Sequence, residues 1–61
     1  MKRIINDELS KRLVQVMADE YKKYFPDATV KMHRLKEGGW GWNADGVEMM
    51  GVQVEEKGEN N

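Results

Sequence analysis

The only proline of the chain, Pro26, separates two segments with different hydrophobic periods. Before it, apolar side chains recur every three or four residues, which is the period of one face of an α-helix. After it, they alternate, as in a strand with one buried face. Because proline disfavours helical geometry in the residue before it, the change of period indicates a helix followed by strands. We therefore expect an α+β fold.

The segment before Pro26 predicts a helix from about Asp7 to Tyr24. Asn6 or Asp7 can cap its start by accepting hydrogen bonds from the free backbone N–H groups of the first turn. The side chains expected to face the core are Leu9, Leu13, Val16, Met17, Tyr21 and Tyr24. An alternative use of the end of this helix is a contact patch of Tyr21, Tyr24, Phe25, Lys22 and Lys23, but core packing of the tyrosines is favoured.

The segment after Pro26 predicts three strands, over residues 28–36, 40–42 and 47–56. Gly38 and Gly39 suit the first turn, and residues 43–46 suit a type I turn closed by a left-handed glycine. A bulge is predicted within residues 49–51, because strict alternation would otherwise put the valines of the third strand on opposite faces. The expected inward set is Val47, Met49, Val52 and Val54 with Trp40 and Trp42 from the second strand.

The predicted fold is one N-terminal amphipathic helix packed on a three-stranded antiparallel β-meander, in the order α-β-β-β. With 61 residues the chain has room for one domain, which we place at residues 1–56, and residues 57–61 are expected to form a frayed tail. A chain this short buries only about 60% of its unfolded surface, so we expect a small core.

The charge balance and the absence of cysteine exclude several classes of protein. Ten Lys and Arg face eleven Asp and Glu, a net charge of -1, which is unlike a strongly basic nucleic-acid coat or an acidic disordered chain. With no cysteine there is no disulfide scaffold and no thiolate metal site. No signal-peptide core and no apolar run of roughly 20 residues is present, so we expect a cytoplasmic protein without membrane contact.

The candidate catalytic and ligand-binding patterns are weak, so we expect no enzyme, no cofactor and no bound metal. Thr29 and His33 share a strand face but lie roughly 13 Å apart at about 3.3 Å per residue. Residues 43–48 superficially resemble a calcium loop without its full ligand set, and a hairpin turn explains them. Residues 39–44 match a dinucleotide-binding glycine pattern, but no helix follows to hold a pyrophosphate. We also expect no pocket of the usual size, roughly 300 Å³ or more.

The distribution of charge along the chain favours a protein-binding module. Residues 43–61 contain one lysine and five acidic residues, a net charge of -4. Such an acidic surface can steer association with a basic surface of a partner. The residues expected to bind the partner are Asp45, Glu48, Glu55 and Glu56. As a hypothesis from size, the chain is an accessory or inhibitory protein of bacterial or phage origin.

Two alternatives remain open from the sequence. In the first, the chain binds nucleic acid through a basic and aromatic sheet face made of Lys31, His33, Arg34, Lys36, Trp40 and Trp42. This arrangement needs both tryptophans to face outward, and their burial in the core is favoured. In the second, the five methionines and the small core leave an apolar strip that is buried against a second copy of the chain.

Overall fold

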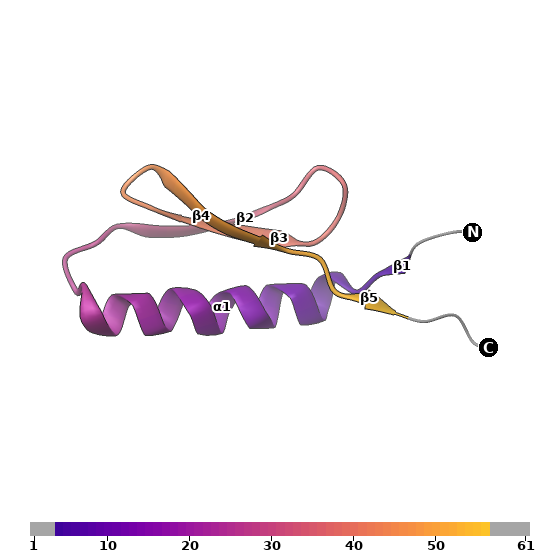
Figure 1. Ribbon diagram of the computed structural model, residues 1–61, viewed down its shortest axis with the longest axis horizontal. Coiled ribbons are helices and arrows are strands. Elements are labelled where there is room, and N and C mark those ends of the chain that lie inside the picture. Colours follow the sequence, from indigo (N-terminus) through magenta and orange to yellow (C-terminus); the bar gives the residue numbers. More distant parts are fainter. Residues whose placement is uncertain (1–3, 57–61) are drawn as a thin grey trace.

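The computed structural model describes residues 4–56. Its elements in chain order are β1 (Ile4–Ile5), α1 (Asp7–Tyr24), β2 (Val30–Arg34), β3 (Trp40–Ala44), β4 (Val47–Val52) and β5 (Glu55–Glu56). The helix α1 packs along one face of the antiparallel sheet β2-β3-β4, and β1 pairs with β5 beside the start of α1 (Figure 1). The α+β prediction is confirmed. The expected tail at residues 57–61 lies outside the described residues.

The bounds of α1 are those that the sequence predicts. The side chain of Asn6 caps the start of the helix, because its Oδ1 accepts a hydrogen bond from the backbone N–H of Leu9 at 2.9 Å. At the other end, the backbone N–H of Phe25 donates to the carbonyl of Tyr21 at 2.9 Å, and Pro26 follows. Within residues 4–56 no helix is both long and apolar enough to cross a membrane.

The face of α1 that packs on the sheet is not the predicted one. Ser10, Val14 and Ala18 are buried, and Met17 and Tyr21 are half-buried beside them. The prediction is wrong for the four side chains that remain exposed, which are Leu9, Leu13, Val16 and Tyr24. The physical reason is the size of the groups on the sheet: the indole of Trp42 fills the space under the helix, and only small helix residues let the two backbones approach over it.

The hairpin between β3 and β4 is tighter than predicted. Strand β3 continues to Ala44, which pairs directly with Val47. The two residues between them, Asp45 and Gly46, both have positive φ values of 51° and 83°, as in a type I′ hairpin turn. The expected type I turn over residues 43–46 is therefore wrong. An Asp-Gly pair tolerates the left-handed conformation that this turn requires at both positions.

The predicted bulge is present, but it selects a different inward residue. Trp42 pairs with Met50 and Asn43 pairs with Glu48, so Met49 is the extra residue of β4. Met50, not Met49, therefore shares the inward register with Trp42. Gly39 has a φ of 92°, and a Cβ there would lie 2.3 Å from the carbonyl oxygen of Val52, so only glycine fits at the start of β3.

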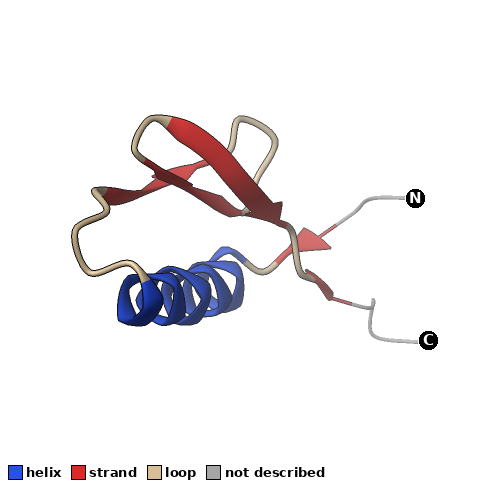
Figure 2. Cartoon of the chain, turned by 60° about the vertical axis from the view of Figure 1, so that its left-hand side comes forward, coloured by secondary structure: helices blue, strands red, loops and turns tan. Residues whose placement is uncertain are grey.

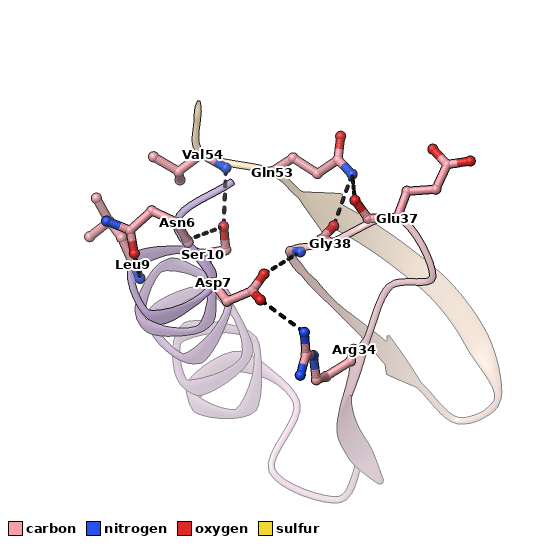
Figure 3. A network of polar contacts seen from close by, with 10 residues as sticks. Asn6, Asp7, Leu9, Ser10, Arg34, Glu37, Gly38, Gln53 and Val54 are labelled. Carbon is pink, nitrogen blue, oxygen red and sulfur yellow. Dashed lines mark hydrogen bonds and ion pairs between the residues drawn. The ribbon is translucent and has the colours of Figure 1, made fainter. Parts of the chain in front are cut away.

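The sequence did not reveal that the third strand ends early. Strand β4 stops at Val52, and Glu55 and Glu56 pair instead with Ile5 and Ile4 in the short β1-β5 ribbon. Figure 3 shows the contacts that redirect the chain at the start of α1. The buried hydroxyl of Ser10 donates to the carbonyl of Asn6 at 2.9 Å and accepts from the backbone N–H of Val54 at 3.0 Å.

A carboxylate in the first turn of α1 ties the helix to the same end of the sheet. One oxygen of Asp7 accepts from the Arg34 guanidinium at 2.8 Å, and the other accepts from the backbone N–H of Gly39 at 2.7 Å (Figure 3). Asp7 thus joins α1 to the end of β2 and the start of β3, while Asn6 caps the helix. Figure 2 shows the outcome: α1 covers one face of the sheet, and the opposite face carries no helix.

The buried face of α1 can be tested by making the same Val→Ala substitution at a buried and at an exposed position. Val14 is fully buried in the core cluster, whereas 63% of the Val16 surface is exposed. We expect Val14→Ala to lower the free energy of unfolding by about 2 kcal/mol, because it removes buried methyl groups and leaves a cavity. Val16→Ala is expected to change it by less than about 0.5 kcal/mol. Urea unfolding at high dilution measures both, and equal losses would contradict the observed face.

Candidate functional site

The four acidic residues expected to bind a partner do not form one surface. Asp45 lies at the tip of the β3-β4 hairpin, near the end of α1, and Glu48 lies within β4. Glu55 and Glu56 form β5, which lies beside the start of α1. The 18 residues of α1 span about 27 Å at roughly 1.5 Å per residue. The predicted residues are therefore spread along the whole length of the helix.

These carboxylates also make contacts within the chain. Oδ1 of Asp45 accepts from the backbone N–H of Thr29 at 2.9 Å, which links the hairpin tip to the segment before β2. Oε2 of Glu56 accepts from the side-chain amide of the capping residue Asn6 at 2.7 Å. All four acids keep exposed surface. Their charges thus remain available to a partner, although their positions are fixed by the fold.

Glu48 meets His33 across the central strand. Nε2 of His33 lies 2.9 Å and 3.1 Å from the two carboxylate oxygens of Glu48. Gly41 lies between them on β3, and a Cβ there would lie 2.9 Å from Oε2 of Glu48 and 3.0 Å from Cε1 of His33. The hydrogen bond to Glu48, together with one to the carbonyl of Arg34, raises the pKa of His33 above its ordinary value of 6.5.

The basic and aromatic face expected for nucleic acid is not assembled. Trp42 is 6% exposed and its ring packs edge-on against Tyr21 at 5.3 Å, so the favoured burial of this tryptophan is confirmed. Trp40 is half-buried, and the ammonium of Lys11 lies 5.1 Å from its ring centroid. The guanidinium of Arg34 is paired with Asp7. No outward pair of tryptophan rings exists on which bases could stack.

A pocket of about 360 Å³ lies where the end of α1 meets the hairpin tip. Its lining consists of Tyr21, Tyr24, Phe25, Pro26, Asp27, Ala28 and Asp45. The expectation that the domain has no pocket of this size is wrong. The pocket forms because the chain after the helix crosses to β2 beside the hairpin tip, where Asp45 and Thr29 exchange hydrogen bonds of 2.8 Å and 2.9 Å.

The pocket combines aromatic rings with negative charge. The rings of Tyr21 and Phe25 are 4.8 Å apart, and Tyr24 and Phe25 are largely exposed at its wall. Asp27 and Asp45 contribute carboxylates, and the end of α1 adds the negative end of the helix dipole. Aromatic faces and carboxylates both attract cations, and the rings also pack against an aliphatic chain. This arrangement suits the side chain of an arginine or a lysine.

Only part of this pocket can be predicted from the sequence. The sequence predicts, as an alternative, a contact patch of the aromatic side chains at the helix end, but with Lys22 and Lys23 as its charged members. Nothing in the spacing indicates that Asp45, about twenty residues further along, joins them. Tyr21 packs on the sheet as expected, whereas Tyr24 does not. The Lys22 ammonium instead donates to the carbonyl of Ala28 at 3.1 Å.

Comparison of the chain with protein-family models, with curated proteins and with solved structures finds no match. The residues that the structure describes include no group of three or more histidine, aspartate or glutamate side chains placed to hold a metal ion. The interpretation of the site therefore depends on the geometry of this chain alone.

The contact between His33 and Glu48 predicts how stability changes with pH. Because folding raises the pKa of His33, the folded chain binds its proton more tightly than the unfolded chain does. The resulting stabilisation is fully present below the ordinary value of 6.5 and is lost as the pH rises through the raised pKa. We expect the free energy of unfolding to fall between about pH 6 and about pH 8.

Two substitutions distinguish the contribution of this pair to the pH dependence from that of the other charges. Glu48→Gln is expected to remove most of the decrease in the free energy of unfolding between these pH values. Glu37→Gln makes the same change at another exposed glutamate, and it is expected to keep the decrease. Urea unfolding of the three proteins at both pH values measures the difference. A fall of equal size in all three would show that the pair does not contribute to it.

Proposed function

We propose that this chain is a non-enzymatic protein-binding module that docks on a basic surface of a cytoplasmic partner, as an accessory or inhibitory protein. The observation that carries this proposal is the aromatic and acidic pocket at the end of α1. A protruding arginine or lysine of the partner would enter it. Its aliphatic chain would lie against Tyr24 and Phe25, and its charge would face Asp27 and Asp45.

The fold supports the role of Asp45 in this interaction. Its carboxylate is held at the rim by the backbone N–H of Thr29, so little ordering of the side chain is left to occur on binding. The two exposed rings provide the apolar contact that a point charge alone would lack. Arginine and aromatic side chains are enriched among the residues that contribute most to protein interfaces.

The other predicted acids contribute in a different way. Glu48, Glu55 and Glu56 lie outside the pocket. Their negative charges extend the acidic field of the second half of the chain and attract a basic partner from a distance. Such charges increase the rate of association more than they slow dissociation. We therefore expect substitutions at Glu55 and Glu56 to act through salt-dependent association rates, and substitutions at the pocket to act through dissociation.

An arginine-rich peptide tests the pocket directly. In an NMR titration of the full chain, we expect the largest shifts at Tyr24, Phe25 and Asp45. Asp45→Asn keeps an oxygen that can accept from Thr29 and removes only the charge, so the fold should be preserved. We expect it to weaken binding about fivefold to tenfold, as loss of a charged hydrogen-bond partner does.

The matched control is Glu56→Gln, which removes the same charge at the opposite end of α1. We expect it to weaken binding by less than about twofold at physiological salt, where the charges of the surface are screened within about 8 Å. The proposal would be overturned if both variants weakened binding equally. It would also be overturned if the peptide shifted residues over the whole surface without saturation.

A further inference from the structure

A second hollow lies directly beside the pocket at the end of α1. It has a volume of about 330 Å³ and is lined by Met17, Glu20, Tyr21, Tyr24 and Trp42. Tyr21 and Tyr24 also line the pocket. The two spaces are therefore neighbours that share two aromatic side chains.

The ring of Tyr21 forms the wall between the two spaces. Its centroid lies 4.8 Å from that of Phe25, which lines the pocket, and 5.3 Å from that of Trp42, which lines the hollow. Tyr24 is 72% exposed and stands at the outer rim of both spaces. A partner segment that is bound in the pocket therefore passes next to the hollow.

The hollow differs from the pocket in chemistry. Its lining is almost entirely apolar and includes the half-buried Met17 and the accessible edge of Trp42. The one charged group in this lining is Glu20, whose carboxylate lies 3.6 Å from the ammonium of Lys23. The pocket, in contrast, contains two carboxylates. The hollow therefore suits an uncharged apolar side chain, which gains free energy when it is removed from water.

The distance between the two spaces matches that between nearby side chains of one peptide segment. The lining of the hollow begins at Met17 and that of the pocket at Tyr21, four residues later on α1. Four residues of a helix span about 6 Å. In an extended peptide, residues i and i+2 point to the same side and lie about 6.6 Å apart. One extended segment can therefore reach both spaces at once.

We propose that this site recognises two side chains of its partner, a cationic one in the pocket and a large aliphatic one, two residues away, in the hollow. The inference rests on the proposed function, because the pocket is what holds the partner segment against α1. Once the segment is bound, the aliphatic side chain is buried with little further loss of translational freedom. The hollow thereby selects among basic segments according to the residue beside the arginine or lysine.

Two short peptides with blocked ends test this recognition in an NMR titration of the full chain. In Leu-Gly-Arg-Gly-Leu, a leucine stands two residues before and after the arginine, so both chain directions are served. In Ala-Gly-Arg-Gly-Ala, alanines replace both leucines. We expect the leucine peptide to bind about fivefold to tenfold more tightly, because one isobutyl group is removed from water. The methyl signal of Met17 is expected to shift with the leucine peptide only.

A matched pair of substitutions assigns this difference to the hollow. The side chain of Glu20 is 54% exposed at the rim, so Glu20→Trp can fill the hollow without disturbing the core. We expect it to reduce the advantage of the leucine peptide to less than about twofold. Glu8→Trp makes the same change at an exposed position outside both spaces and is expected to keep the advantage. Circular dichroism confirms that both variants are folded.

A third peptide, Leu-Gly-Ala-Gly-Leu, separates this inference from the proposed function. We expect it to bind about tenfold more weakly than the peptide that contains arginine, because it lacks the charged hydrogen-bond donor. If arginine is required but the leucine and alanine peptides bind equally, the inference about the hollow is wrong and the proposed pocket stands. An equal advantage of leucine in the two tryptophan variants would also overturn it. If arginine is not required, or no peptide binds, the proposed function is wrong and this inference fails with it.

Discussion

The packing of Trp42 against the small face of α1 is the contact on which the rest of the structure depends. A 61-residue chain has few large side chains, and the structure buries this indole almost completely over Val14 and Ala18. The close approach that it requires fixes which face of the helix is inside. It also fixes which apolar side chains are left outside, so the same contact creates the core and the exposed flank at Val16.

The polar contacts at the start of α1 act together with this small core to hold the helix against the sheet. Asp7 holds the end of β2 and the start of β3, and Ser10 holds the chain as it leaves β4. Each contact joins segments that are far apart in the sequence, and the contacts with Gly39 and Val54 also satisfy backbone N–H groups. The helix is thereby fixed in register against the sheet, which positions both the pocket and the β4 edge.

The pocket and the exposed part of β4 differ in chemistry and in place. The pocket at the end of α1 joins aromatic rings to Asp27 and Asp45, and it suits a cationic side chain. The exposed part of β4 is apolar instead, with Val47, Met49 and Met50 between 41% and 62% exposed.

The change of hydrophobic period at Pro26 determined the helix and the three strands of the sheet, their order and the bounds of the helix, because caps and periodicity are local properties. The inward face of α1 was decided only in three dimensions, since a pattern of hydrophobicity does not tell whether small or large residues fit over Trp42. The tertiary structure also decided the formation of the β1-β5 ribbon and of the pocket. Both depend on backbone hydrogen bonds between distant segments, such as Asn6 with Val54 and Asp45 with Thr29, which leave no local signal in the sequence.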